Sequence, residues 1–473
     1  MSKISVNRRD FFRSAAVVGA AGSLGAGTIF ASCSGGEKAP VLVPLASLAN
    51  AYIPELTDFA NDGKPLRAGL IGCGGRATGA AANFLNAGPN LQIVVLGDLF
   101  MDRIDGCRKM LKDKFKVEVP DDKCFTGFDN YKKVLASDID LVIIATPPAF
   151  RPMHFEAAVE AGKHVFMEKP VCVDGPGARS VMATAKKAES QGLVVVTGTQ
   201  RHHQRKYVES FQQIQKGVIG EIVSGNVYWN QSMLWYKSRE EKWTDMEWMV
   251  RDWVNWKWLS GDHIVEQHVH NLDVFNWFTG KKPVKAVAFG ARQRRITGDQ
   301  YDMFSVDFEY EGGIRLHSMC RQIDGCKNNV SEFIQGTKGS WTSAGAGGNH
   351  EIKDLAGNVI WKTDGEKEKA EHKQIDPYTL EHVDFINHIR AGKPLNQAVE
   401  TTISCLTAIM GRESAYTGKE VTWDEIFNSA TSTLPAKLEL GAYDMKAYTV
   451  PVPGKPLEAK PKDAKPKDAK KKA

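Results

Sequence analysis

One segment, residues 65–98, constrains the fold more than any other, because it places a glycine-rich turn between two apolar runs. The first run ends at Gly72, and Gly72, Gly74 and Ala77 follow the spacing G-x-G-x-x-(G/A). The first glycine permits a tight turn, the second lets the backbone approach a pyrophosphate, and a small third residue lets the helix pack on the strand. Asp98 follows the second run, 21 residues after Ala77. An acid about 20 residues on typically bonds the ribose 2′-hydroxyl of NAD.

The spacing alone also occurs in α/β proteins that bind no nucleotide, but the flanking strands, the helix and the acid favour a nucleotide site. The predicted cofactor contacts in this segment are Gly72, Gly74, Gly75, Arg76, Ala77 and Asp98. A carboxylate at position 98 should repel a 2′-phosphate, so NAD is expected in preference to NADP. The segment predicts an N-terminal Rossmann domain with a parallel sheet.

The chain has 473 residues, which is too long for one ordinary core and predicts two domains with tails. We expect a signal segment at 1–33, a linker at 34–64, a Rossmann domain at 65–199, an α+β substrate domain at 200–448 and a disordered tail at 449–473. The net charge of +5 lies in that tail, because residues 451–473 contain eight lysines and three acids. The rest of the chain is neutral, so its charge gives no reason to expect nucleic acid as a partner.

The first 33 residues have the form of an export signal. Arg8 and Arg9 lie in the twin-arginine motif NRRDFF, and a weakly apolar run follows at residues 15–31. Residues 30–33, FASC, resemble a lipoprotein cleavage site with Phe in place of the usual Leu. We expect lipidation of Cys33, export to the periplasm and attachment to a membrane, with simple cleavage or an uncleaved anchor as alternatives. The eight cysteines form no CxxC pair or zinc spacing, so buried free thiols are expected.

A second cluster of site residues follows two further strands of the first domain. Thr146 and Pro147 come directly after the apolar run at 140–145, and Glu168 and Lys169 follow the run at 163–167. The carboxyl ends of parallel strands form the ligand-binding edge of such a sheet, so these four residues are predicted to contact the cofactor. Burial and a neighbouring charge can tune a lysine there for proton transfer. The alternative is a structural ion pair between Lys169 and Glu168.

The second half contains successive strand-like runs at 221–229, 284–291, 302–310, 313–320, 330–335 and 339–343, which predict an antiparallel sheet. Amphipathic helices are predicted at 378–391 and 397–416. Seven of the eleven tryptophans fall between residues 229 and 258. Such rings suit sugar faces and equally suit a core or an interface. Arg251 and Trp253, from this cluster, and Arg201 and His203, where the chain leaves the first domain, are predicted substrate contacts.

Residues 260–273 are expected to form one helix capped by Ser260 or Asp262. Glu266, His270 and Asp273 would share one face of it. Histidine is suited to proton transfer because its ordinary pKa is about 6.5. His268 is a further predicted substrate contact. His263, His268 and Glu266 could instead bind a divalent cation, although no metal is our prediction.

The motif at residues 72–77, TPP, AGKHVFMEKP and the later H-x-x-D resemble, in order and spacing, the Gfo/Idh/MocA oxidoreductases, the family of glucose–fructose oxidoreductase and inositol dehydrogenase. The resemblance covers residues 66–423. It implies that Lys169 lies against the nicotinamide and the reacting hydroxyl, that His270 is the catalytic histidine, and that an open-faced second sheet is used for oligomerisation. The family usually has Asp where this chain has Glu266, whose side chain is one methylene longer.

Together these features predict an NAD-dependent oxidoreductase that acts on a sugar, polyol or glycoside. Lys169 and His270 would take part in transfer of the hydroxyl proton, and Glu266 would orient His270. The cofactor would stay bound through the cycle. An NAD-dependent glycoside hydrolase or lyase that oxidises its sugar transiently is the alternative. A binding protein that keeps the nucleotide as a structural part is a third class, but loss of Lys169 or His270 would have favoured it, and both are present.

Overall fold

The computed structural model describes residues 51–343 and 348–454. The predicted signal segment, with Arg8, Arg9 and Cys33, and most of the basic tail lie outside these residues. None of the described helices combines the length and apolar character needed to cross a membrane.

The N-terminal half is built on a six-stranded parallel sheet with the order β3-β2-β1-β4-β5-β6. This is the strand order of a Rossmann domain. The strands are β1 (Leu66–Ile71), β2 (Leu91–Gly97), β3 (Cys124–Phe125), β4 (Leu141–Ile144), β5 (His164–Met167) and β6 (Val195–Thr197). The connecting helices are α1 (Gly75–Asn86), α2 (Met101–Phe115), α3 (Asn130–Leu135), α4 (Arg151–Glu160) and α5 (Gly175–Ser190). Strand β4 is buried throughout because helices cover a parallel sheet on both faces.

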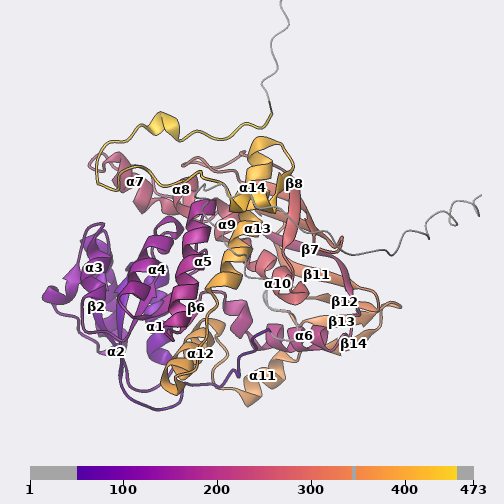
Figure 1. Cartoon of the computed structure of the whole chain (residues 1–473), viewed down its shortest axis with the longest axis horizontal. Helices are drawn as coiled ribbons and strands as arrows, with labels where there is room; N and C mark the ends of the chain where they lie inside the picture. The colour runs from indigo at the N-terminus through magenta and orange to yellow at the C-terminus, as the bar shows by residue number, and fades with distance from the viewer. Residues whose placement is uncertain (1–50, 344–347, 455–473) are drawn as a thin grey trace, which may run out of the picture. The chain divides into compact units, whose positions relative to one another are not determined.

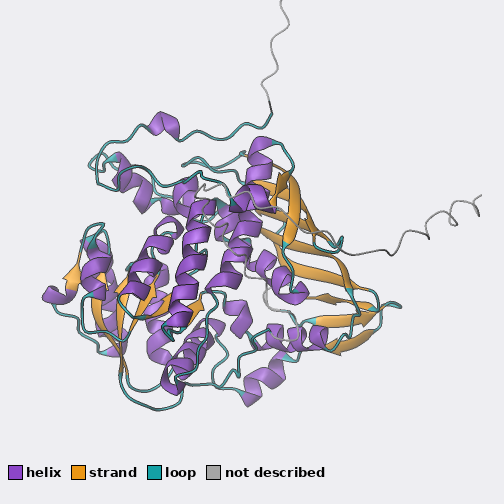
Figure 2. Cartoon of the chain, in the orientation of Figure 1, coloured by secondary structure: helices purple, strands orange, loops and turns teal. Residues whose placement is uncertain are grey.

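The C-terminal half holds a nine-stranded sheet with the order β14-β13-β12-β11-β7-β10-β9-β8-β15. Its strands are orange at the right of Figure 2. Its strands are β7 (Ile222–Gln231), β8 (Pro283–Ala291), β9 (Met303–Tyr310), β10 (Arg315–Gln322), β11 (Asn329–Gly336), β12 (Gly339–Thr342), β13 (Glu351–Asp354), β14 (Val359–Lys362) and β15 (Val421–Thr422). The predicted fold class is therefore confirmed. The sheet is mixed, however, because β10 pairs with β7 in parallel, whereas all the other strand pairs of this sheet are antiparallel.

Several short helices and two long ones complete the second half (Figure 1). They are α6 (Arg205–Gln215), α7 (Asp245–Arg251), α8 (Lys257–Ser260), α9 (His263–Glu266), α10 (Val269–Thr279), α11 (Gly365–Glu371), α12 (Pro377–Ala391), α13 (Ala398–Thr417) and α14 (Trp423–Phe427). Helix α12 packs on the first half of the chain, where Val383, Phe385 and Ile386 join the core beneath α1. The predicted second domain thus returns to the Rossmann sheet, and the boundary at residue 200 stays a prediction.

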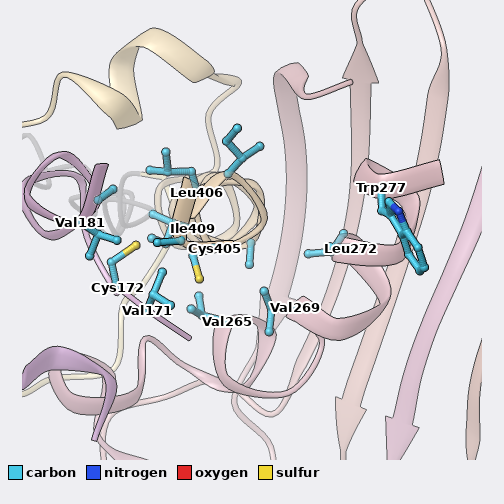
Figure 3. Packing of buried hydrophobic residues seen from close by; sticks show 14 of the residues in the cluster. Val171, Cys172, Val181, Val265, Val269, Leu272, Trp277, Cys405, Leu406 and Ile409 are labelled. Atoms are coloured by element: carbon cyan, nitrogen blue, oxygen red, sulfur yellow. The ribbon is translucent and has the colours of Figure 1, made fainter. Parts of the chain in front are cut away.

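Helix α13 is the central packing element of the described chain. It contacts α5 on one side and α9, α10 and the second sheet on the others. Figure 3 shows Leu406 and Ile409 of α13 in one apolar cluster with Val181 of α5 and Val265 of α9. Almost all of its residues are buried. The prediction of an amphipathic helix is wrong here, because a helix enclosed on all sides has no solvent face to make polar.

Both predicted flexible ends contain packed residues. In the predicted linker, the Tyr52 hydroxyl donates a 2.6 Å hydrogen bond to Asp384, and Asp58 pairs with Arg205 at 2.9 Å. In the predicted tail, Val450 packs against the core and the Pro451 carbonyl accepts a hydrogen bond from Tyr301. The prediction that disorder begins at residue 449 is wrong for residues 449–454, because this short apolar stretch has a core to pack against.

Candidate active site

A cavity of about 660 Å³ is lined by residues of both halves of the chain at the carboxyl edge of the first sheet. Most of the predicted site residues line it, namely Gly72, Gly74, Gly75, Arg76, Asp98, Thr146, Pro147, Glu168, Lys169, Arg251, Trp253, Glu266 and His270. Residues that lie nearly two hundred positions apart in the sequence therefore face one concave space, which is the usual form of a small-molecule site.

The glycine turn has the geometry that a bound pyrophosphate requires. Gly72 has a φ of 91°, and a Cβ there would lie 3.0 Å from the backbone of Ala145 and Thr146. A Cβ on Gly74 or Gly75 would meet no heavy atom within 4 Å, so this backbone is open to a ligand. No side chain among the described residues caps the first turn of α1, whose N–H groups are therefore available to an anion. Ala77 is buried behind the turn, where it packs rather than lining the cavity.

Asp98 is held beside this turn by two backbone hydrogen bonds. Its carboxylate accepts from the Cys73 N–H at 2.6 Å and from the Phe100 N–H at 2.9 Å. Desolvation raises the pKa of Asp98 above its ordinary value, although these bonds act in the opposite direction. The arrangement leaves an acid at the end of β2, where the fingerprint requires a partner for a ribose hydroxyl. The geometry of the turn and the acid therefore fits NAD.

Lys169 follows β5, and its ammonium group points to the second half of the chain. The Nζ atom donates to the Glu266 carbonyl oxygen at 2.5 Å and lies 3.3 Å from Glu266 Oε1. Glu168, its sequence neighbour, accepts a hydrogen bond from Arg76 instead. The alternative of a Lys169–Glu168 ion pair is thus not what the structure shows. The Lys169–Pro170 peptide bond is cis.

His270 lies in the first turn of α10, with its ring stacked on Trp229 at a centroid distance of 5.6 Å. Desolvation, followed by the charges of Lys169 and Arg201, lowers its pKa well below 6.5. The imidazole is therefore neutral at physiological pH. None of the hydrogen bonds described for the chain occupies its ring nitrogens, so the ring can accept a proton from a ligand in the cavity.

The predicted single helix at residues 260–273 is broken after Glu266. Its N-cap is Asp262, as expected, but α9 ends at Glu266 and the His270 N–H bonds to the Gln267 carbonyl at 3.3 Å. In a continuous helix the His270 N–H would bond to the Glu266 carbonyl. That carbonyl is instead free to accept from Lys169. The break therefore creates a lysine-binding position at the cavity.

The break also changes the predicted role of two acids. The Glu266 carboxylate contacts Lys169 and Gln267 in the structure, and no described hydrogen bond joins it to His270. Asp273 lies away from the cavity, where it bonds to His202 at 2.7 Å and Ser404 at 2.8 Å. The expected shared face of Glu266, His270 and Asp273 is therefore wrong, and Glu266 orients Lys169 instead.

Three predicted substrate contacts do not line the cavity. Arg201 forms a buried ion pair with Glu332, His203 lies 3.1 Å from Asp384, and His268 lies 2.7 Å from the Ser318 hydroxyl. Buried polar side chains need such partners, and each of these three side chains contacts one within the protein. The prediction that they contact substrate is not supported by their placement.

Arg251 and Trp253 do line the cavity, but Arg251 is committed to protein contacts. Its guanidinium bonds to both carboxylate oxygens of Asp102, at 3.0 and 3.1 Å, and to Glu247 at 2.8 Å. It also lies 3.9 Å from the centroid of the Phe100 ring. A direct contact with substrate is therefore a weaker interpretation of Arg251 than a structural one.

The residues of the alternative cation site point in different directions. His263 Nδ1 lies 3.0 Å from Asp262, His268 faces Ser318, and Glu266 faces Lys169. Across residues 51–343 and 348–454, no three His, Cys, Asp or Glu side chains are grouped so that they could hold a metal ion.

Several residues that line the cavity were not singled out from the sequence, among them Tyr378 and Trp229. Tyr378, at the start of α12, lies under the Arg76 guanidinium at 4.8 Å from its ring centroid. Arg76 also lies 3.5 Å from the buried Glu381, one turn further along that helix. No local sequence pattern predicts these contacts, because they depend on the packing of α12 against α1 and the first sheet. Trp229 belongs to the tryptophan cluster, but its stacking on His270 needs the pairing of β7 to be known.

Comparison with known families finds two matches that together cover most of the chain. Residues 66–217 match the model described as "Oxidoreductase family, NAD-binding Rossmann fold". Residues 212–423 match "Oxidoreductase family, C-terminal alpha/beta domain". The two matches correspond to the two sheets and overlap at residues 212–217, at the end of α6.

Individual proteins give more distant similarities. Inositol 2-dehydrogenase of Salmonella typhimurium is 23% identical over 337 residues, which are 70% of this chain and 87% of that protein. Glycosyl hydrolase family 109 protein 1 of Bacteroides fragilis is 30% identical over 160 residues, and the match spans 33% of each chain. Scyllo-inositol dehydrogenase from Lactobacillus casei, solved with NAD(H) and scyllo-inositol, has a TM-score of 0.57 at 20% identity, over 76% of this chain and 99% of that one.

Proposed function

The chain belongs to the Gfo/Idh/MocA oxidoreductase family, and from this premise we propose that it oxidises a hydroxyl of a sugar, polyol or glycoside with a bound NAD that stays in place. One observation carries the proposal. Lys169 and His270, from different halves of the chain, line the same cavity as the open glycine turn and Asp98. A proton-transfer pair thus lines the same cavity as a nucleotide-binding turn.

The chemistry of the two side chains is complementary. NAD supplies the acceptor for the hydrogen that leaves the carbon with its electron pair. The neutral His270 ring accepts the proton of the reacting hydroxyl. The Lys169 ammonium donates a hydrogen bond to the same oxygen and stabilises the negative charge that develops on it. Glu266 holds that ammonium through its carbonyl and its carboxylate.

The substrate class rests on similarity and on the cavity wall. The inositol dehydrogenase relative is named for a cyclic polyol. Trp229, Trp235 and Trp253 line the cavity here, and flat aromatic faces suit the C–H faces of such rings. NAD is proposed over NADP because Asp98 faces the cavity where a 2′-phosphate would lie.

The test is a panel of sugars, inositols and glycosides added to the purified protein, with the absorbance of bound reduced nicotinamide as the signal. At least one compound should reduce the bound cofactor in the unmodified protein, and a His270→Gln variant that still binds nucleotide should reduce it at least a hundredfold more slowly. Replacement of Lys187, an exposed lysine of α5, is the matched control. Equal rates in all three proteins would reject the assignment.

The glycosyl hydrolase relative supports a second candidate, a redox-neutral glycosidase. Oxidation of a ring hydroxyl to a ketone acidifies the neighbouring C–H bond, so a base such as His270 could remove that proton. The electron pair would then expel the glycosidic leaving group, which takes up a proton. Water would add across the resulting double bond, with its hydroxyl on the carbon that lost the leaving group and a proton on the neighbouring carbon. The hydride taken up by NAD would finally return to the ketone carbon, with a proton to its oxygen. This route predicts incorporation of solvent deuterium at a sugar carbon, which a simple dehydrogenase does not require.

We also propose export by the twin-arginine route and lipid attachment through Cys33, from the sequence motif alone. Homo-oligomer formation is proposed because the second sheet exposes apolar side chains, with Phe289 72% and Val287 53% exposed. Light scattering on the purified protein tests the oligomeric state. The membrane fraction of cells that express Cys33→Ser tests the anchor.

A further inference from the structure

Residues 232–260, between β7 and α9, cover one end of the cavity. The first half contributes Asp98, Leu99 and Phe100, which follow β2, and the covering segment contributes Tyr236, Val250 and Arg251. Asp98 marks the place of the adenosine ribose. Lys169 and His270 mark the reacting end. The part of the segment around Val250 and Arg251 therefore closes the cavity at its adenosine end, since Arg251 bonds to Asp102 and lies over Phe100.

A separate apolar cluster joins this covering segment, residues 232–260, to the first half of the chain. Phe100, Ala149 and Phe150 of the first half pack there with residues of α7 and α8, among them Met246, Met249 and Trp258. The chain beyond α14, yellow in Figure 1, runs beside α7 and α8, and the Tyr443 N–H bonds to Asp245 at 2.9 Å. The covering segment is therefore packed against the first half of the chain and against the segment that follows α14.

One ion pair joins the cover directly to the nucleotide-binding half. Arg251, the last residue of α7, bonds with two nitrogens to the two carboxylate oxygens of Asp102, in the first turn of α2. Its guanidinium lies 3.9 Å from the Phe100 ring centroid and 5.3 Å from that of Trp243. Its side chain is only 13% exposed. The Arg251 hydrogen bond, offset in part by desolvation, keeps the pKa of Asp102 below its ordinary value.

We propose that residues 232–260 are a cofactor-retaining cover and that the Arg251–Asp102 pair is the latch at its rim. The pair joins α7 to the residues that follow Asp98, so a nucleotide that leaves from the adenosine end must separate these two groups. The inference rests on the proposed function for the identity of the nucleotide, but not for its substrate. It assigns to Arg251 a positioning role in place of the predicted substrate contact.

The test measures how fast the purified protein releases NAD. The protein is loaded with isotope-labelled NAD, excess unlabelled NAD is added, and the label that remains bound is followed with time. Asp102→Asn removes the charge of one partner, and Arg251→Met removes the other partner and the ring contacts. Asp113→Asn is the matched control, since Asp113 is an exposed acid of the same helix paired with Lys109 at 2.8 Å.

We expect release about three- to tenfold faster in Asp102→Asn and faster still in Arg251→Met, with Asp113→Asn unchanged. The double variant should release no faster than Arg251→Met, because the two residues act as one contact. Higher salt should accelerate release from the unmodified protein but not from the double variant. Release rates that are equal in the unmodified protein and both single variants would overturn the latch. Failure of the unmodified protein to bind NAD at all would instead reject the proposed function.

Discussion

Replacement of Lys169 by Met should abolish most of the oxidation activity while the protein stays folded. The ammonium group is the only cation in hydrogen-bond contact with the Glu266 carboxylate among the described residues, and both side chains are 10% exposed. Breaking a fully buried pair costs about 3–5 kcal/mol. Because Gln267 still donates to Glu266 and the cavity admits water, we expect about 2–3 kcal/mol here. A typical folding free energy of about 5–15 kcal/mol can tolerate this loss.

The loss of rate should be larger than the loss of stability. A missing proton-transfer or charge-stabilising group lowers the rate by about 10²–10⁴, which is about 2.7–5.4 kcal/mol of barrier. The assay is single-turnover reduction of the bound cofactor, with the thermal unfolding midpoint measured on the same samples.

A second variant separates catalysis from stability. In Lys169→Met/Glu266→Gln the unpaired carboxylate is removed, so the unfolding midpoint should recover while the rate stays low. Lys187→Met is the control, since Lys187 also lies 3.3 Å from a glutamate, Glu160, but at an exposed site; it should change neither quantity. Recovery of turnover in the double variant would show instead that Lys169 serves only to neutralise Glu266 and has no catalytic role.

Three further predictions follow from the same contacts. The pKa of His270 is lowered, so its neutral form persists below pH 6.5; kcat/KM should therefore stay level from pH 8 down to 6.5, and an acid limb at or above pH 6.5 would contradict this base. Asp98→Ala should weaken NAD binding and reduce the preference for NAD over NADP in calorimetric titrations, because the acid that repels a 2′-phosphate is removed while the cation Arg103 still lines the cavity. An unchanged ratio of the two dissociation constants would show that Asp98 does not select the cofactor. Gly72→Ala should lower nucleotide affinity at least tenfold, since its φ of 91° and the 3.0 Å approach to Ala145 exclude a Cβ; a Gly106→Ala variant, whose Cβ meets nothing within 4 Å, controls for the substitution itself.

The features that sequence could predict are those with a local cause. The glycine turn, the acid after β2 and the lysine after β5 all lie at strand ends, and the topology of a parallel sheet brings strand ends to one edge. Six of the strands in the second sheet were visible as apolar runs. The short strands β13, β14 and β15 were not, since each has too few residues to show a period.

The features that sequence could not predict arise from contacts between distant segments. Residues 262–273 contain no Gly or Pro to announce a helix break. The break after Glu266 frees its carbonyl oxygen, which accepts a hydrogen bond from Lys169, 97 residues earlier in the sequence. Likewise Arg201 and His203 were expected at the substrate, but their partners Glu332 and Asp384 lie on β11 and α12. Side chains of this type have several possible partners, and only the packed structure selects among them.

On the proposed function, a retained NAD takes hydrogen from a carbon of a carbohydrate in the cavity between Lys169 and His270. The most direct measurement is mass spectrometry of the nucleotide extracted from protein purified without added cofactor, before and after one turnover with a substrate deuterated at the reacting carbon. We predict NAD before the reaction and reduced cofactor that carries one deuterium in its nicotinamide ring after it. Protein that carries no nucleotide and gains none on incubation with NAD, or reduced cofactor without the label, would contradict the account.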